Sequence, residues 1–342
     1  MCCRCGGGGA ALSSVNPFRL CTGLRALGYL MLPLVAAIAG AVYYAVIAAV
    51  WGPRIVKAGH VSAIALFIVI LFHLLLVMLI SCYLRVVFSD PGTVPADWRP
   101  PFEEDIIVQS TFPNEHDASD VRDPTSVDTG IRQCARCQNW KPPRCHHCSV
   151  CDRCVLKMDH HCVWVVNCVG ARNYKFFLLF LVYTFLETAL SSLALLPHFI
   201  SFFSETSRHT NSTENLSITF IASILSAAFA LSLLCFISMH VSLVLTNTTS
   251  IEIYEKKNSA IWRYDLGNLK YFEQVFGTKK WLWFFPLYSN EDLENISALH
   301  GLEFPTRANE PFKGLNENIS SIFNELPWLN EKNMKTKSIT KN

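Results

Sequence analysis

Residues 134–168 read CARCQNWKPPRCHHCSVCDRCVLKMDHHCVWVVNC and hold eight cysteines and four histidines. Several of these cysteines are separated by two residues, a spacing at which a tight turn directs two thiolates to the same tetrahedral zinc ion. Two such ions would use eight of the twelve candidate ligands. We therefore expect at least one cysteine of this stretch to remain free to react.

Long apolar runs flank the cysteine-rich stretch on both sides. The chain has 342 residues, of which 51% are hydrophobic and only 16% charged, so it is poorer in charge than an ordinary soluble protein. One apolar run could be a buried core helix, but four together predict an α-helical polytopic membrane protein with four transmembrane helices. The expected spans are Leu27–Val50, Val61–Leu84, Phe176–Phe199 and Ile218–Leu245.

Basic residues near the span ends predict the orientation in the membrane. The loop from Arg85 to Lys175 carries eleven Lys or Arg, whereas the loop after the third span carries only Arg208. Both termini and the cysteine-rich stretch are therefore expected on the cytoplasmic side, and the glycosylation sequon at Asn211 on the other. A reducing cytoplasm disfavours disulfides, so the clustered Cys and His are expected to be metal ligands or nucleophiles.

Composition divides the chain into six segments. No internal repeat is recognised, and the net charge of +2 gives no indication of nucleic-acid binding. The aromatic run 281–285 is expected at the membrane interface, and the polar tail from about Asn290 is expected to be mobile. The segments are a leader (1–25), helices 1 and 2 (26–88), a linker (89–131), a small zinc-stabilised cytoplasmic module (132–175), helices 3 and 4 (176–246) and a cytoplasmic tail (247–342).

The run Asp159-His160-His161-Cys162 resembles the signature of the DHHC-type (zinc-finger DHHC) protein S-acyltransferases, or palmitoyltransferases, and Val163 after it resembles a plant-like branch. The resemblance implies transfer of a long-chain acyl group from acyl-CoA to cysteines of substrate proteins, through an acyl-cysteine enzyme intermediate. It covers most of the chain and includes Asp90-Pro91-Gly92, Thr249-Ser250-Ile251-Glu252 and Val275-Phe276-Gly277.

The resemblance also implies which residues hold zinc. Each set contains three cysteines and one histidine and has no open position for water, which indicates structural rather than catalytic metal. One set is Cys134, Cys137, His147 and Cys154; the other is Cys148, Cys151, His161 and Cys168. Because the zinc region is too small for a hydrophobic core, metal is expected to supply much of its folding energy, and short hairpins are expected there.

Cys162 is expected to be the nucleophile. A thiolate is the reactive form of cysteine, and His160, two residues away, can take its proton. Asp159 can orient the imidazole and stabilise its protonated form. The alternative makes Cys162 a further ligand or a bystander. Cys145 is left over as well, but it departs from the family pattern and is expected to be non-catalytic.

The acyl-CoA would place its chain in the helix bundle and its headgroup at the cytoplasmic face. Lys141, Arg144 and His146 are expected contacts for its phosphates, since charge-assisted donors suit phosphate oxygens. The alternative for these three is that they are solvated bases or stabilise their loops. Trp164 would shield the reacting thioester or anchor at the interface.

Glu187 is an ionisable residue within the third span, where such residues are costly and are functional suspects. It lies about thirteen residues, or roughly 20 Å, after Tyr174 at the rise of an α-helix. At this depth the resemblance implies a residue that limits acyl-chain length, with Val42 and Tyr43 as facing partners. We expect Glu187 to cap the cavity through a hydrogen bond to Tyr43 or a nearby hydroxyl. The alternative is a helix-packing role.

Two positions depart from the family pattern outside the cysteine-rich stretch. Ser250 replaces a threonine and keeps the hydroxyl. Tyr271 replaces an asparagine with a structural role, which puts the docking of the tail in question unless Asn268 substitutes for it.

Three rival functions are less consistent with the sequence. A membrane ubiquitin ligase would need a closing Cys-x2-Cys pair after Cys154, and a transporter would be expected to have more ionisable residues in its spans than His73, Glu187 and His240. A catalytically silent zinc-containing scaffold remains as the alternative. The compartment is expected to be an endomembrane, the Golgi first and the plasma membrane as the alternative.

Overall fold

Four long apolar helices form the larger part of the structure. The computed structural model describes residues 17–57, 60–100, 132–205, 213–253 and 264–306. All four helices are long and apolar enough to cross a membrane, as predicted, and the chain is therefore a multi-pass membrane protein. They are α1 (Pro17–Tyr43), α2 (Ala63–Phe88), α4 (Tyr174–Glu205) and α5 (Thr213–Leu245), and the candidate spans run over Leu27–Arg54, Ala63–Phe88, Tyr174–Phe203 and Leu216–Leu245.

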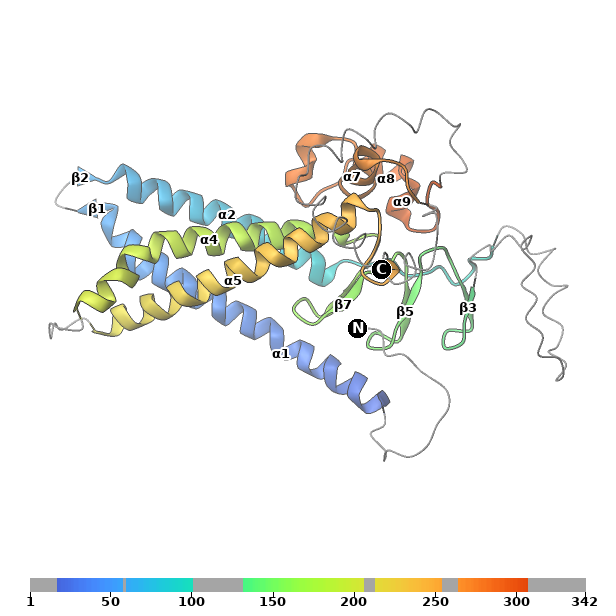
Figure 1. The fold of residues 1–342 in the computed structure, drawn as a ribbon, viewed down its shortest axis with the longest axis horizontal. Helices are drawn as coiled ribbons and strands as arrows, with labels where there is room; N and C mark the ends of the chain where they lie inside the picture. Colours follow the sequence, from blue (N-terminus) through green and yellow to red (C-terminus); the bar gives the residue numbers. More distant parts are fainter. Residues whose placement is uncertain (1–16, 58–59, 101–131, 206–212, 254–263, 307–342) are drawn as a thin grey trace, which may run out of the picture.

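A turn region joins α1 to α2 at the end of the bundle far from the cysteine-rich module (Figure 1). There α1 continues into the π-helix η1 (Tyr44–Trp51) and the 3-10 turn η2 (Gly52–Arg54), and the two-residue strands β1 (Val56–Lys57) and β2 (His60–Val61) lead into α2. Leu, Ile and Phe side chains of α2 point outward, as lipid-facing residues do. Helices α4 and α5 run side by side along the bundle (Figure 1).

The cysteine-rich module consists of three short antiparallel hairpins at the other end of the bundle (Figure 1). This confirms the expected position of the module between the second and third long helices. The hairpins are β3 (Arg132–Cys134) with β4 (Asn139–Lys141), β5 (His146–Cys148) with β6 (Arg153–Val155), and β7 (His160–Cys162) with β8 (Asn167–Val169).

The three hairpins repeat one backbone pattern, so the expectation of no internal repeat was wrong. The first strands end at Cys134, Cys148 and Cys162, which are 14 residues apart, and each of these cysteines pairs with the residue five positions later. The turn residue before that partner has a φ of 52° in all three hairpins; these residues are Gln138, Asp152 and Val166.

The sequence hides the repeat because few side chains are conserved between its copies. The second cysteine of the first two hairpins is replaced by Val165 in the third. The cysteine at the second position of β6 and β8 has Trp140 as its counterpart in β4. Backbone geometry is therefore retained while the metal ligands change.

The C-terminal segment packs against the end of the bundle that carries the cysteine-rich module, and it is ordered further than expected. Beyond Asn290 the structure contains two helices, so the predicted mobility from this residue is wrong as far as residue 306. The segment comprises α7 (Asn268–Phe276), η4 (Lys280–Phe284), α8 (Asn290–Asn295) and α9 (Ser297–His300).

Two buried polar contacts hold this segment in place. Lys175 at the start of α4 donates from Nζ to the carbonyl oxygens of Phe276 at 3.1 Å and Leu287 at 2.5 Å. The Asp292 carboxylate accepts hydrogen bonds from the N–H and hydroxyl of Thr278. Gly277 has a φ of +88°, and a Cβ there would lie 2.6 Å from the Asp292 carboxylate, so only glycine fits.

Tyr271 has a defined place in this segment. It is buried, and its hydroxyl contacts the Asp265 carboxylate and accepts a hydrogen bond from the N–H of Leu266 at 2.9 Å. The tail is thus packed without the asparagine expected from the family pattern. The side chain of Asn268, the sequon at Asn211 and most of the linker lie outside the described residues.

Candidate functional site

Four ligand-type side chains gather between the first and second hairpins. His147 Nδ1 lies 3.7 Å from Cys134 Sγ, 3.3 Å from Cys137 Sγ and 3.9 Å from Cys154 Sγ. The turn of the first hairpin supplies the two cysteines that are two residues apart, and the paired strands of the second supply the histidine and the third cysteine. We call this set cluster 1.

An equivalent set, cluster 2, joins the second hairpin to the third. His161 Nδ1 lies 3.8 Å from Cys148 Sγ, 3.4 Å from Cys151 Sγ and 3.6 Å from Cys168 Sγ. The two sets predicted from the family resemblance are therefore the two sets that the fold brings together.

The ligand spacings in both clusters match those around a tetrahedral zinc ion. Zinc–sulfur bonds of about 2.3 Å and zinc–nitrogen bonds of about 2.0–2.1 Å separate neighbouring ligand atoms by about 3.5–3.8 Å. The Sγ atoms of Cys137 and Cys154 are 3.7 Å apart, and those of Cys151 and Cys168 are 3.5 Å apart. The residues present thus fit zinc in number, type and spacing.

Cys162 lies outside both clusters although it occupies the position of their first cysteine. In the third hairpin the second cysteine position is filled by Val165, which is fully buried. The Cys162 side chain is itself buried in an apolar cluster that includes Val86 of α2 and Phe177 and Leu181 of α4. The thiol is therefore placed beside the ends of two membrane helices, on the side of the bundle that carries the hairpins.

Asp159 and His160 form a short hydrogen bond next to this thiol. His160 Nδ1 lies 2.6 Å from Asp159 Oδ2, and Asp159 is 2% exposed. The other carboxylate oxygen of Asp159 accepts a hydrogen bond from the N–H of Ser250 at 2.8 Å, while the Ser250 hydroxyl donates to the Asp159 carbonyl at 2.7 Å. Ser250, which replaces the threonine of the family pattern, therefore still holds Asp159 in place by two hydrogen bonds.

The electrostatics of the pair favour a charged imidazole beside a carboxylate. Burial alone would lower the pKa of His160, but hydrogen bonds with Asp159 and Cys162 outweigh burial and raise the pKa to about 9. Burial alone would raise the pKa of Asp159, but the hydrogen bond from His160 and the nearby positive charge hold it below its usual value. The site is therefore built to stabilise a proton on His160.

Aromatic rings from two membrane helices enclose His160, and one of them was not predicted as part of the site. The His160 ring lies 5.1 Å from that of Phe177 and 6.0 Å from that of His240, centroid to centroid. Tyr174 Oη and His240 Nδ1 are 3.1 Å apart. The sequence shows His240 only as an ionisable residue in the fourth span, since its distance in sequence from His160 conceals the contact.

Arg144 requires a correction. Its guanidinium is buried, donating from Nε and Nη2 to the two carboxylate oxygens of Glu252 at 2.7 and 2.6 Å, and it also donates to Asn247. The rings of Tyr264 and Phe304 cover it at 4.7 and 4.9 Å. Because its donors are engaged internally, Arg144 joins the second hairpin to the segment after α5 rather than facing a phosphate.

The other predicted contacts for acyl-CoA lie on the surface of the module or at its edge. Lys141 on β4 and His146 on β5 are half-buried, and Trp164 is 46% exposed with its carbonyl accepting a hydrogen bond from Tyr83 of α2. Cys145 is buried against Cys134 and Cys154 but belongs to neither cluster.

Glu187 lies deep in the bundle without the partner expected for it. It is 5% exposed, and both of its carboxylate oxygens lack a hydrogen-bond partner among the described residues. Tyr43 instead lies with its hydroxyl 3.3 Å from His73 Nε2. The predicted Glu187–Tyr43 hydrogen bond is therefore wrong. Val42 is buried in the bundle, and its position facing Glu187 stays a prediction.

Replacement of Val166, in the turn of the third hairpin, is expected to increase the stability of the protein. A β-branched residue in the left-handed region is strained by about 1–2 kcal/mol, and Val166 has a φ of 52°. Val166→Asn should therefore raise the free energy of unfolding by about 1 kcal/mol, measured by thermal unfolding in detergent.

The register-equivalent Gln138→Asn in the first hairpin is the matched control and should give a smaller gain, because glutamine is unbranched at Cβ. Val166 also packs against Gly28 of α1, where an added Cβ would lie 2.9 Å from Val166 Cγ1. Destabilisation by Val166→Asn would mean that this packing outweighs the backbone strain.

Comparisons with known proteins match the region that carries these clusters and most of the rest of the chain. Residues 128–257 match the profile described as DHHC palmitoyltransferase. The chain is 52% identical over 298 residues to "Probable protein S-acyltransferase 12" of Arabidopsis thaliana, covering 85% of this chain and 98% of that protein. It is 47% identical to "Probable protein S-acyltransferase 13" of the same plant, covering 88% and 99%. It is 34% identical to human "Palmitoyltransferase ZDHHC2", covering 74% and 76%.

Proposed function

Because the chain belongs to the DHHC palmitoyltransferase family and is a protein S-acyltransferase, we propose that Cys162 accepts the acyl group and passes it to a cysteine of a substrate protein. The observation that carries this assignment is the 2.6 Å contact between Asp159 and His160, two residues before a thiol that neither cluster uses. A nucleophile, a base and a group that orients the base are the parts that such a transfer needs.

The first half-reaction loads the enzyme. Asp159 holds Nδ1 of His160, which leaves Nε2 to take the proton from the Cys162 thiol. The thiolate then attacks the carbonyl carbon of the acyl-CoA thioester, a new carbon–sulfur bond forms at Cys162, and the bond to the CoA sulfur breaks. The departing CoA thiolate takes the proton back from His160.

The second half-reaction runs the same exchange with a different thiol. The substrate cysteine gives its proton to His160 and attacks the acyl-Cys162 carbonyl, which transfers the acyl group and releases the Cys162 thiolate. That thiolate recovers the proton from His160. The kinetics are therefore of the ping-pong type.

The surroundings of Cys162 support a long-chain donor such as palmitoyl-CoA. Its apolar neighbours on α2 and α4 offer a path for a hydrocarbon chain into the bundle, while Lys141 and His146 lie on the module and suit the CoA phosphates. Clusters 1 and 2 would hold two structural zinc ions, which fix the three hairpins relative to one another.

We place the module and both termini on the cytoplasmic side of an endomembrane, with the Golgi as the first compartment to examine. The substrates would be cytoplasmic or membrane proteins with accessible cysteines.

Labelling with a clickable acyl-CoA tests the proposal directly. The purified full chain is incubated with alkynyl palmitoyl-CoA, and the label is mapped by mass spectrometry. We expect a single hydroxylamine-sensitive acyl group on Cys162, since hydroxylamine cleaves thioesters. A label on any other cysteine, or one that resists hydroxylamine, would contradict the assignment.

We expect Glu187 to determine which acyl-chain length the enzyme prefers. At roughly 20 Å from the start of α4, its buried carboxyl would close the end of a cavity for a long chain. Glu187→Ala should therefore shift donor preference toward longer chains, and Glu187→Trp toward shorter ones. Competition between acyl-CoA donors of graded length measures the shift as a change in relative acylation of the enzyme.

Thr188→Val is the matched control for Glu187. Thr188 is the next residue on the same helical turn, and its hydroxyl is used within α4 by hydrogen bonds to Thr184 and Phe185. It should leave the donor profile unchanged. An unchanged profile in both Glu187 variants would return Glu187 to a helix-packing role.

A further inference from the structure

The end of α2 and the segment that follows it contact the same position in each of the three hairpins. We call these residues, 86–99, the strap. In every hairpin the residue directly opposite the first cysteine faces this strap; these residues are Asn139, Arg153 and Asn167. The strap meets them in reverse order of sequence, the third hairpin first.

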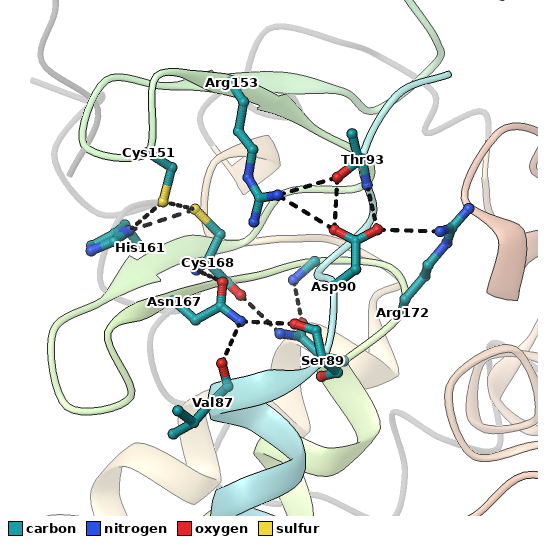
Figure 2. Close-up of polar contacts among 12 residues, drawn as sticks. Val87, Ser89, Asp90, Thr93, Cys151, Arg153, His161, Asn167, Cys168 and Arg172 are labelled. Atoms are coloured by element: carbon teal, nitrogen blue, oxygen red, sulfur yellow. Dashed lines mark hydrogen bonds and ion pairs between the residues drawn. The ribbon is translucent and has the colours of Figure 1, made fainter. Parts of the chain in front are cut away.

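The contacts with the first two hairpins are made by charged side chains. Arg153 donates from Nη1 to Thr93 Oγ1 at 3.2 Å and lies 3.6 Å from Asp90 Oδ1, while Arg172 lies 3.2 Å from Asp90 Oδ2 (Figure 2). Arg99 reaches Asn139 Oδ1 at 3.4 Å. The contacts of Arg153 and Asn139 attach the two hairpins of cluster 1 to the strap.

Asn167 makes a different contact, with the end of the membrane helix itself. Its Nδ2 lies 3.0 Å from the carbonyl oxygen of Val86, 3.3 Å from that of Val87 and 2.9 Å from that of Ser89 (Figure 2). The last carbonyls of a helix have no partner within the helix, and this one amide group donates to those of Val86 and Val87 at the end of α2.

The same side chain also holds the backbone beside cluster 2. Asn167 Oδ1 accepts a hydrogen bond from the N–H of Cys168 at 2.9 Å, and Asn167 pairs directly with Cys162 in the hairpin. Asn167 is buried. One side chain thus connects the end of α2, a ligand of cluster 2 and the strand position opposite the thiol.

We propose that Asn167 is a positioning residue for acyl transfer: it holds Cys162 at a fixed height above the end of α2, where the thiol meets a thioester whose chain lies in the bilayer. This inference rests on the proposed role of Cys162 as the nucleophile. A small soluble reagent is not tied to the membrane when it reaches the thiol, whereas a membrane-embedded chain fixes where the thioester lies. Acylation by acyl-CoA therefore depends on the height of the thiol above α2, whereas alkylation by a small reagent does not.

Two variants of Asn167 separate its contacts. Asn167→Asp retains Oδ1 for the Cys168 N–H and replaces the donor to α2 with an oxygen that faces three carbonyls. Asn167→Ala removes both contacts. The matched control is Asn139→Ala, which removes the equivalent side chain from a hairpin that does not carry the thiol.

The experiment compares two reactions of Cys162 in the full chain, with zinc content measured in parallel. We expect palmitoyl-CoA to acylate both Asn167 variants about tenfold more slowly or worse, as misplacement by about an ångström can have a larger effect than this. Alkylation of Cys162 by iodoacetamide should stay within about twofold of wild type, with zinc content unchanged. Asn139→Ala should behave like wild type in both reactions.

Two results would overturn the inference. Normal palmitoylation in both Asn167 variants would show that the contact with α2 does not position the thiol. Equal loss of palmitoylation, alkylation and zinc in both variants would show that Asn167 only holds the fold. Failure of the proposed function is recognised separately, because Cys162→Ser would then still form a hydroxylamine-sensitive acyl-enzyme.

Discussion

Cys162→Ser should abolish both the acyl-enzyme and transfer to a substrate cysteine, with a loss of about a thousandfold or more. Removing the nucleophile of a site in which nucleophile and base act together has effects of this size. Zinc content should remain at the wild-type level, because Cys162 belongs to neither cluster. Clickable palmitoyl-CoA labelling, a substrate-labelling assay and metal analysis on the same preparation measure the three quantities.

Cys145→Ala is the control for this variant. Cys145 is a buried cysteine of the same module and lies outside both clusters, so its loss should leave labelling and zinc content nearly unchanged. If Cys162→Ser retained full transfer activity, the acyl-cysteine intermediate would have to be assigned elsewhere. If Cys162→Ser lost zinc together with activity, Cys162 would have to be treated as a ligand.

The four spans and the general layout follow from composition because the membrane imposes a simple rule. A helix that crosses it must be apolar over about twenty residues. Three of the predicted runs fall within the observed spans, and the second begins at Val61, two residues before α2. The membership of the two metal clusters followed from family resemblance, whereas spacing alone left several assignments open. The fold then brings each predicted set together across neighbouring hairpins.

Contacts between distant segments could not be predicted in this way. Nothing near Arg144 in sequence indicates that Glu252 will neutralise it, so a buried ion pair was mistaken for a ligand contact. His240 reaches the site only because α5 packs against α4. The capping of α2 by Asn167 depends on hairpin register, which the side chains of the three hairpins do not reveal.

Order in the C-terminal segment was underestimated for a related reason. Its polar composition suggested mobility, but Asp292 is buried and serves as the acceptor for Thr278. A polar residue whose hydrogen bonds are satisfied internally can belong to a packed segment. Composition does not distinguish such a residue from a solvated one.

Removal of metal should unfold the cysteine-rich module while the helices persist. The hairpins are short, and the free energy of binding structural zinc, about 10–16 kcal/mol in small zinc domains, is also folding free energy. We expect two zinc ions per chain before treatment. A strong chelator should abolish acyl-enzyme formation and expose the module to protease, as followed by metal analysis, labelling and limited proteolysis. A stoichiometry of one ion, or none, would contradict the two-cluster assignment.

The two neighbouring histidines provide the sharpest test of which residues bind metal. His161 belongs to cluster 2 and His160 to the Asp159 pair, so His161→Ala should lose one zinc ion, whereas His160→Ala should keep both and slow acylation. His147→Ala should also lose one ion, but cluster 1 does not contain residues of the hairpin that carries Cys162. We therefore expect His161→Ala to reduce acylation more than His147→Ala does. Interchangeable phenotypes of the His160 and His161 variants would refute the ligand assignment, because loss of zinc would then fail to distinguish the metal ligand from the base.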